Sequence, residues 1–481
     1  MLFNSIEYAF FLPIVFLIYW AIGYAHINEN TKLRLQNAFV LIASYVFYGW
    51  WDWRFLLLIA FTSFCSWGSG LLIASPPALS RREGADKQRM LSPKFWMVAN
   101  IVLNLGILAV FKYYDFFVSE FGQLFGISTD SLLLRIILPV GISFYTFQAL
   151  SYSIDVYRQK IEPTKDIIAF FAFIAFFPQL VAGPIERATN LLPQFLQNRK
   201  FLYDQATDGM RQILWGLFKK IVVADNCATY VDQVWATYDT QTGSTLLLAA
   251  ILFTFQIYGD FSGYSDIAIG TAKLFGIKLM RNFNNPYFSR DIAEFWRRWH
   301  ISLTTWFRDY VYIPLGGSQQ GRWCTLRNVC IVFLLCGLWH GANWTYMGWS
   351  IYHILLFAPL IFFGAQHRYR DRATLQQWFP MLFTFMLVTL GWILFRAPSM
   401  SDAIGFLSGV CTSSIFSCPA ELSVSILFTM IAIVWMLYIE WQHRDSENAP
   451  LPHNQWVYYM LILAIWWFAY PSTQEYIYFQ F

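Results

Sequence analysis

The sequence predicts an all-α integral membrane protein, and two observations lead to this fold class. Hydrophobic residues make up 57% of the 481 residues and charged residues only 13%, against roughly 25% charged residues in soluble domains. Apolar runs of about 20 residues, the length that crosses a bilayer, recur along the chain with no long polar block between them. We therefore expect residues 1–481 to form a single polytopic membrane domain.

About 11–12 transmembrane helices are expected, together with re-entrant and interfacial amphipathic helices. Residues 1–24 lack a basic n-region and a small-residue cleavage site, so we expect a retained first helix and no cleaved signal peptide. Of two short apolar segments, 167–181 and 213–223, we expect one to cross and the other to be re-entrant. The remaining candidate crossings are residues 8–24, 36–50, 54–74, 94–118, 131–156, 246–264, 326–340, 346–364, 379–395, 422–440 and 455–470.

Basic loops set the expected orientation. The richest of them, SRREGADKQR at residues 80–89, belongs in the cytoplasm by the positive-inside rule. Counting crossings from there places the basic loop 367–372 on the same side and the N-terminus on the outer side. The C-terminal tail, residues 471–481, then also faces outward.

A helix over residues 290–310 would be amphipathic and would lie at the cytoplasmic interface. At 100° per residue, its large aromatic side chains share an arc of about 100°, and polar residues occupy the opposite side. Arg297, Arg298 and Arg308 could there meet lipid phosphates or an anionic donor substrate. His300 lies at the margin of the aromatic face, where a packed interfacial histidine is as good an interpretation as a functional one.

His340 closes an apolar run that begins near Arg327. Thirteen helical residues at 1.5 Å each would carry it about 20 Å into a hydrocarbon layer of about 30 Å. Gly341 and Asn343 would loosen the helix beside it. An ionisable group at this depth is costly unless it faces a protein cavity, which favours a functional role over that of a satisfied core histidine. A neutral imidazole can take a proton from a hydroxyl and return one.

A polar cluster of Gln256, Asp260 and Asp266 interrupts another apolar segment. Gly259 and Gly263 would permit an irregular backbone that lines a cavity, where Asp260 could orient a catalytic group or bind a cation. An anchor between helices, held by hydrogen bonds, is the slightly favoured alternative. The cysteines show no zinc-like pairing, so no metal site is predicted, and neither a nucleotide-binding loop nor GxSxG occurs.

Several motifs together resemble the membrane-bound O-acyltransferase family, and specifically its alginate O-acetylation branch. The main one is RNFNNPYFSRDIAEFWRRWHISLTTWFRDYVYIPLGGS, followed forty residues after its histidine by LWHGANW. FFPQLVAGPIER, YGDFSGYSDIAIG and the terminal EYIYFQF extend the likeness over nearly the whole chain. The resemblance implies acyl transfer to a hydroxyl in a core with a tunnel. His340 matches the family's intramembrane catalytic histidine, and His300 matches its second, more cytoplasmic position.

The resemblance also implies a donor, partners and a location. The donor would be a cytoplasmic acyl-CoA such as acetyl-CoA, or a similar thioester, and no bound cofactor is expected. An extracytoplasmic SGNH-type acetyltransferase and the polysaccharide synthesis and secretion machinery would complete polymer acetylation outside the bacterial inner membrane. Tyr478 matches the tyrosine of a C-terminal acyl-transfer motif and could carry the acyl group as a transient ester. An interfacial aromatic tail is an equally good interpretation of it.

Alternative functions remain open at this point. The acceptor could be another envelope polymer, such as peptidoglycan, cellulose or teichoic acid. A polysaccharide transporter or flippase would also need many crossings and intramembrane carboxylates, although it would not need His340 together with RRWHISLTTWFRDY. A structural scaffold that recruits an outside enzyme would need neither histidine. Nothing in the sequence indicates nucleic-acid binding.

Overall fold

The computed structural model describes residues 1–74, 92–366, 368–369, 371–420, 422–444, 446, 449–452, 454–469 and 476. Within these residues the regular secondary structure is helical throughout, as predicted. The chain forms two compact units: Met1–Gly209 with Ala268–Met280, and Met210–Ile267 with Arg281–Phe481. Whether both act as the single domain expected from the sequence stays a prediction.

The first unit begins with four long helices and continues with short, buried ones. The motif FFPQLVAGPIER forms the short helix Phe177–Leu180 and the non-helical segment after it, and nearly all of its residues are buried. The helices are α1 (Ile6–Tyr24), α2 (Glu29–Gly49), α3 (Arg54–Ala74), α4 (Pro93–Phe125), α5 (Ile142–Tyr157), α6 (Ile167–Ala175), α7 (Phe177–Leu180) and α8 (Ala188–Phe195).

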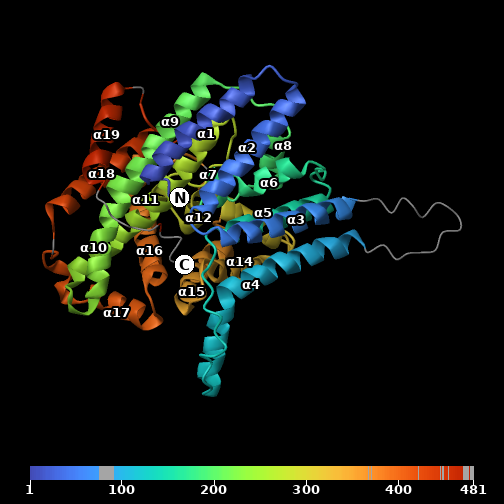
Figure 1. The fold of residues 1–481 in the computed structure, drawn as a ribbon. Coiled ribbons are helices and arrows are strands. Elements are labelled where there is room, and N and C mark those ends of the chain that lie inside the picture. The colour runs from blue at the N-terminus through green and yellow to red at the C-terminus, as the bar shows by residue number, and fades with distance from the viewer. Residues whose placement is uncertain are drawn as a thin grey trace. The chain divides into compact units, whose positions relative to one another are not determined.

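Polar side chains join α3, α4 and α5 inside this unit, and Figure 1 shows α3 beside α4. Asn100 on α4 donates to the hydroxyl of Ser153 on α5 at 2.7 Å, and Ser69 on α3 shares a hydrogen bond with the same hydroxyl at 3.1 Å. Small hydroxyl and amide residues allow membrane helices to approach closely and hydrogen-bond, where the hydrophobic effect supplies little driving force. These contacts therefore specify the packing of the three helices.

The second unit contains most of α9 (Tyr203–Leu217) and of α11 (Gly243–Leu274), whose other residues belong to the first unit. It also contains the predicted site residues that the structure describes. A π-helix, η1 (Phe218–Ala224), continues α9 directly. The other helices are α10 (Asp225–Ala236), η2 (Tyr238–Thr240), η3 (Pro286–Phe288), α12 (Ile292–Arg298), α13 (Ile301–Phe307), η4 (Arg308–Tyr312), α14 (Arg322–His340), α15 (Trp344–Phe362), η5 (Leu375–Gln377), α16 (Trp378–Arg396), α17 (Met400–Val410), η6 (Ser413–Phe416), α18 (Val424–Gln442) and α19 (Gln455–Phe468).

Eight of the described helices are long and apolar enough to cross a membrane: α1, α3, α4, α11, α14, α15, α16 and α18. The chain is thus a multi-pass membrane protein. The expectation of about 11–12 crossings also counted shorter segments. Residues 131–156 become helical only at Ile142, 167–181 splits into α6 and α7, and the apolar C-terminal helix α19 has 14 residues. The polar start of α2 explains why that helix does not qualify.

The single amphipathic helix expected over residues 290–310 is wrong. The chain forms α12, then breaks at Trp299 and His300, and resumes as α13 and the π-helix η4. His300 adopts a φ of +43°, the left-handed region that stops a right-handed helix. The aromatic stripe faces protein, because Trp296, Trp299 and Trp306 are each at most 8% exposed. Helical periodicity could not reveal a two-residue break.

The irregular backbone expected near Asp260 is also wrong, because α11 runs unbroken through Gly259 and Gly263. These glycines instead permit close helix packing. A Cβ atom on Gly259 would lie 2.9 Å from the carbonyl oxygen of Lys219, and one on Gly263 would lie 2.8 Å from that of Gly216. The backbones of α11, α9 and η1 therefore approach each other where only glycine fits.

Candidate active site

His340 is the last residue of α14, and its imidazole lies in an aromatic cage. The helix ends because Gly341 turns to an extended conformation and Asn343 caps α15, accepting from the backbone N–H of Thr345 at 3.0 Å. The predicted loosening of the helix at these two residues is confirmed. His340 is 6% exposed. Ring centroids near its own are those of Trp339 at 4.9 Å, Phe395 at 5.1 Å, Trp349 at 5.5 Å and Tyr346 at 6.5 Å.

His300 is held between α12 and α13 by contacts to Asn282. The Nδ1 atom of His300 lies 3.1 Å from Oδ1 of Asn282, which can only accept, so Nδ1 carries the proton and Nε2 is the basic nitrogen. The backbone N–H of Ile301 donates to the Asn282 carbonyl at 2.8 Å. Burial lowers the pKa of His300, which lies outside the eight candidate membrane helices, to about 3. Its ring is therefore neutral at physiological pH.

The two predicted histidines meet at one indole. The ring of Trp339 on α14 contacts His340 at 4.9 Å and His300 at 5.9 Å between centroids. Forty residues separate the histidines in sequence, so tertiary packing brings them to a common site. The roles predicted for them stay predictions, but their placement is consistent with one reaction centre.

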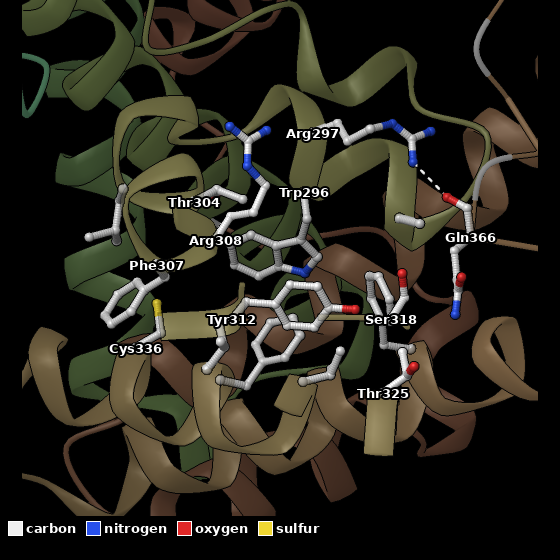
Figure 2. A pocket seen from close by; sticks show the side chains of 16 residues that line it. Trp296, Arg297, Thr304, Phe307, Arg308, Tyr312, Ser318, Thr325, Cys336 and Gln366 are labelled. Atoms are coloured by element: carbon white, nitrogen blue, oxygen red, sulfur yellow. Dashed lines mark hydrogen bonds between the residues drawn. The ribbon is translucent and has the colours of Figure 1, made fainter. Parts of the chain in front are cut away.

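A cavity of about 340 Å³ lies next to this centre and is shown in Figure 2. Its volume falls within the roughly 300–1,000 Å³ that is common for small-molecule sites. Side chains from α12, α13 and η4 line one part, and side chains from α14 and α15 line another. Most of them are apolar, with hydroxyl groups of Thr304, Ser318 and Thr325 among them. The cavity suits a slender, largely apolar ligand with some polar groups.

Two of the three arginines predicted on the donor side line this cavity. Arg297 is exposed, and its guanidinium donates to the carbonyl oxygens of Gln366 at 2.8 Å, the dashed line in Figure 2, and of Tyr369 at 2.7 Å. Arg308 is exposed as well, and its Nε pairs with Asp309 at 2.7 Å. Each guanidinium group is planar and presents five N–H donors, a geometry that suits recognition of carboxylate and phosphate groups.

Arg298, the third, does not line the cavity. It donates to the carboxylate of Glu294 at 2.8 Å and to the backbone oxygen of Asn284 at 3.3 Å. The buried Arg290 binds the same carboxylate at 3.0 Å. Glu294 thus ties two arginines together, and Arg298 belongs to a structural network that holds α12.

A wall of two indoles separates the cavity from His340. Trp296 lines the cavity and contacts Trp349 at 5.6 Å between ring centroids. Trp349 in turn contacts His340 at 5.5 Å. Cys336, one turn before His340 on α14, is another cavity residue. The inner end of the cavity therefore approaches the candidate catalytic histidine from behind Trp296 and Trp349.

The predicted carboxylates of α11 form ion pairs with the two lysines of η1. Asp260 binds Nζ of Lys220 at 2.5 Å, and Asp225 binds the same ammonium at 2.8 Å. Asp266 pairs with Lys219, the neighbouring lysine of η1. Gln256 lies one turn before Asp260, and no described residue donates to its Oε1 atom. The alternative weighed from the sequence, an anchor between helices, fits these contacts.

Tyr478, the predicted acyl relay, lies outside the described residues. Tyr476, two positions earlier, is described and is 1% exposed. The ammonium of Lys220 lies 4.2 Å from the centroid of its ring, and the ring of Tyr264 packs against it at 4.6 Å. The ion-paired lysine of η1 thus also makes a cation–π contact with this residue of the C-terminal motif.

Sequence reasoning missed several residues of the centre. Asn282 sets the tautomer of His300, yet no role was expected for it from the sequence, although it stands at the start of the family motif, in RNFNNP. Trp339 and Trp349 were no more than aromatic residues of apolar segments. His353 was findable, because it is a histidine inside an apolar helix and the rule that singled out His340 applies to it equally.

The sequence of this chain is similar to those of known proteins over the region that holds the site. Residues 156–397, which include both histidines and every cavity residue, match the model of the membrane-bound O-acyltransferase family. The chain is 40% identical over 407 residues to a Pseudomonas aeruginosa protein named "Probable alginate O-acetylase AlgI", covering 84% of this chain and 73% of that one. It is 34% identical over 449 residues to a Helicobacter pylori peptidoglycan O-acetyltransferase, covering 85% and 80%.

More distant matches are also named as transferases. A Bacillus subtilis teichoic acid D-alanyltransferase is 27% identical over 270 residues, which cover 53% of this chain and 68% of that one. The family match covers the region that holds His300, His340 and the cavity, and relatives above 30% identity align over most of both chains. These matches favour an acyltransferase over a transporter or a structural scaffold. The chain belongs to the membrane-bound O-acyltransferase family and is an O-acyltransferase of the membrane.

Proposed function

We propose that this protein is an O-acetyltransferase of the bacterial inner membrane that moves an acetyl group from a cytoplasmic thioester toward an exported polysaccharide such as alginate. The observation that carries the proposal is the placement of His340, which is buried at a helix end and separated by two indoles from a cavity that could hold the donor. The names of the relatives from Pseudomonas aeruginosa and Helicobacter pylori support acetyl as the group transferred.

The proposed chemistry is general-base catalysis by His340. The imidazole takes the proton of an acceptor hydroxyl while the hydroxyl oxygen attacks the thioester carbonyl. The new C–O ester bond forms as the C–S bond breaks, and the imidazolium returns its proton to the leaving thiolate. A neutral ring suits this task, since no permanent charge is needed in the apolar cage around His340.

The donor proposed for the cavity is acetyl-CoA or a similar acyl thioester. Its anionic phosphates would meet Arg297 and Arg308, whose planar guanidinium groups are suited to phosphate oxygens. Its uncharged arm would occupy the apolar interior shown in Figure 2. The acyl end would then point toward Trp296 and Cys336, behind which His340 lies. A donor on the cytoplasmic side and an acceptor outside would require only the acyl group to pass.

The final acceptor would be reached through a partner. An extracytoplasmic SGNH-type acetyltransferase, working with the polysaccharide synthesis and secretion machinery, would receive the acyl group and place it on the polymer. We propose that Tyr478 carries the acyl group to this partner. Its phenol oxygen would attack the thioester, release the thiol and hold the acyl group as an ester. Peptidoglycan is the second candidate acceptor, because the Helicobacter pylori relative aligns over 85% of this chain.

The proposal is tested by His340→Ala in cells that carry the normal amount of the protein in their membranes. Ester-linked acetyl groups are released by mild base from the secreted polysaccharide and, separately, from peptidoglycan. We expect a loss of about 10²-fold or more in one fraction, the usual contribution of a general base. His26→Ala, at an exposed histidine, serves as the matched control. Normal acetylation of both fractions by His340→Ala would overturn the proposal.

The relay has its own test, because Tyr478→Phe removes only one hydroxyl. We expect Tyr478→Phe to abolish polymer acetylation while thioester cleavage in isolated membranes falls to the background of His340→Ala. Full polymer acetylation by Tyr478→Phe would exclude the ester on this tyrosine and leave the role of His340 intact.

A further inference from the structure

We propose that His353 is a positioning residue that fixes the indole of Trp296 across the inner end of the cavity and so limits which acyl groups reach His340. This inference deepens the proposed function and rests on it, because it takes the cavity as the donor site. His353 lies on α15, is 1% exposed and belongs to neither the cavity lining nor the cage of His340.

The contact that carries the inference is a hydrogen bond between two buried rings. Nε1–H of Trp296 donates to Nδ1 of His353 at 3.4 Å. An indole nitrogen is a donor only, so Nδ1 must be unprotonated and the neutral imidazole carries its proton on Nε2. Figure 2 shows the indole of Trp296 beside the cavity. Of the two rings, Trp296 faces the ligand space and His353 holds it from behind.

His353 also contacts the second indole of the wall. Its ring lies 4.9 Å from that of Trp349 and 5.0 Å from that of Trp296 between centroids, and it stacks on Phe333 at 6.0 Å with an angle of 7°. Trp349 is one turn before His353 on α15 and contacts His340. One imidazole thus touches both residues that separate the cavity from the candidate catalytic base.

The opposite edge of His353 is closed by α16. A Cβ atom placed on Gly391 would lie 3.1 Å from Nε2 of His353 and 3.2 Å from the ring of Tyr352. Among the described residues, Nε2 has no hydrogen-bond partner. A buried N–H without a partner is costly, so apolar packing alone would favour phenylalanine here. The hydrogen bond to Trp296 gives a reason for histidine.

The consequence is a control on the acyl group. With its N–H bound, the Trp296 indole has one orientation, and the passage toward His340 has a fixed width. Without the bond the indole can turn, and a longer acyl chain can pass. Pockets distinguish chains that differ by a methylene roughly 10- to 200-fold, so a shift of the wall is measurable as a change in chain-length preference.

The test compares acyl donors in membranes that contain the full-length protein. Acetyl-CoA and butyryl-CoA are supplied separately, and release of free thiol is measured above the background of His340→Ala. His353→Phe keeps a ring and removes the acceptor, whereas His353→Gln keeps an acceptor oxygen. Trp296→Phe removes the donor from the other side. We expect the butyryl-to-acetyl ratio to rise about tenfold in His353→Phe and to stay near the wild-type value in His353→Gln.

A second set of variants guards against a purely structural effect. Gly391→Ala presses on Nε2 of His353 from α16 and should alter the same ratio. The double variant His353→Phe/Trp296→Phe should show no larger change than either single one, because both remove the same bond. A structural role would lower both activities in parallel and leave the ratio unchanged.

The outcomes separate the two proposals. A wild-type ratio in His353→Phe, with thiol release intact in the wild-type protein, would overturn the positioning role alone. No thiol release by the wild-type protein above the His340→Ala background would overturn the donor proposal, and the positioning role with it.

Discussion

Oδ1 of Asn282 accepts a hydrogen bond from Nδ1 of His300 at 3.1 Å, and this contact sets which nitrogen of the ring is basic. The same oxygen accepts from the hydroxyl of Ser302 at 2.9 Å, and Nδ2 of Asn282 donates to Ser265 at 3.3 Å. Asn282 therefore orients a histidine that stands in a left-handed backbone conformation beside Trp339. Strained residues of this kind cluster at functional sites.

The first prediction concerns Asn282→Ala. Without the acceptor, His300 loses its fixed tautomer and orientation, and we expect acyl transfer to fall about tenfold, equivalent to about 1.4 kcal/mol of transition-state stabilisation. Ester-linked acetyl on the polymer measures it at equal protein levels. Ser302→Ala is the comparison variant, because it removes another donor to the same oxygen and a 3.5 Å contact to Nδ1 of His300 but keeps the bond from Nδ1 to Asn282. Equal losses in both variants would contradict an orienting role.

The second prediction concerns pH. Burial lowers the pKa of His300 to about 3, below the usual value of about 6.5, so between these values the unfolded chain binds the extra proton. The free energy of unfolding should thus decrease as pH falls from 6.5 toward 3, by up to about 1.4 kcal/mol per pH unit from this residue. The melting temperature in detergent should fall less steeply in His300→Gln than in the wild-type protein.

The contribution of His300 is the difference between the wild-type and His300→Gln melting profiles, because other groups titrate in the same pH range. Burial raises the pKa of Glu186 to about 7, so its carboxyl gives the opposite slope, with stability decreasing as pH rises through that value. Glu186 is present in both proteins and cancels in the difference. Parallel profiles would show that His300 is not buried in the neutral form.

The third prediction concerns the lysine that joins η1 to α11. Lys220→Met leaves Asp260 and Asp225 without their ammonium partner, and breaking a buried pair costs about 3–5 kcal/mol of folding free energy. We expect little folded protein in the membrane, measured by detergent-resistant fluorescence of a fusion. Lys220→Met/Asp260→Asn should recover part of it. Lys32→Met, which breaks an exposed pair with Glu29, should change nothing measurable. Equal levels in all three would contradict the anchor.

The fold class and one half of the site were predictable because they depend on local chemistry. Composition alone fixes an apolar helical protein, and the depth of His340 singles it out before any tertiary contact is known. The end of α14 at His340 also follows from Gly341 and Asn343, which are local signals. These inferences needed only the chain within a few residues of each feature.

The remainder depends on contacts between residues distant in sequence. Helical periodicity continued through residues 290–310, and only the bonds of Asn282 to His300 and Ile301 show why the chain turns there. Asp260 suggested a polar cavity, but its partner is Lys220, 40 positions earlier. The sequence gives no sign that this lysine faces α11, because the π-helix η1 shifts its direction relative to a regular helix.

The last prediction separates two neighbouring arginines by their surroundings. Arg308 lines the cavity and is exposed, whereas Arg298 is bound to Glu294 and Asn284. If the cavity holds an anionic thioester, Arg308→Gln removes the attraction between the guanidinium and the phosphates of the donor. That attraction is the same in the bound donor and in the transition state. We then expect the donor KM to rise about tenfold with kcat changed little.

Arg298→Gln should instead leave donor affinity unchanged and lower the amount of folded protein, because Glu294 loses one of its two arginine partners. Thiol release from acetyl-CoA, measured over a range of donor concentrations and normalised to folded protein, distinguishes the two effects. Arg308→Lys should keep part of the donor affinity, since an ammonium keeps the positive charge but lacks the planar, forked donors of arginine. An unchanged KM in Arg308→Gln would place the phosphates of the donor away from this end of the cavity.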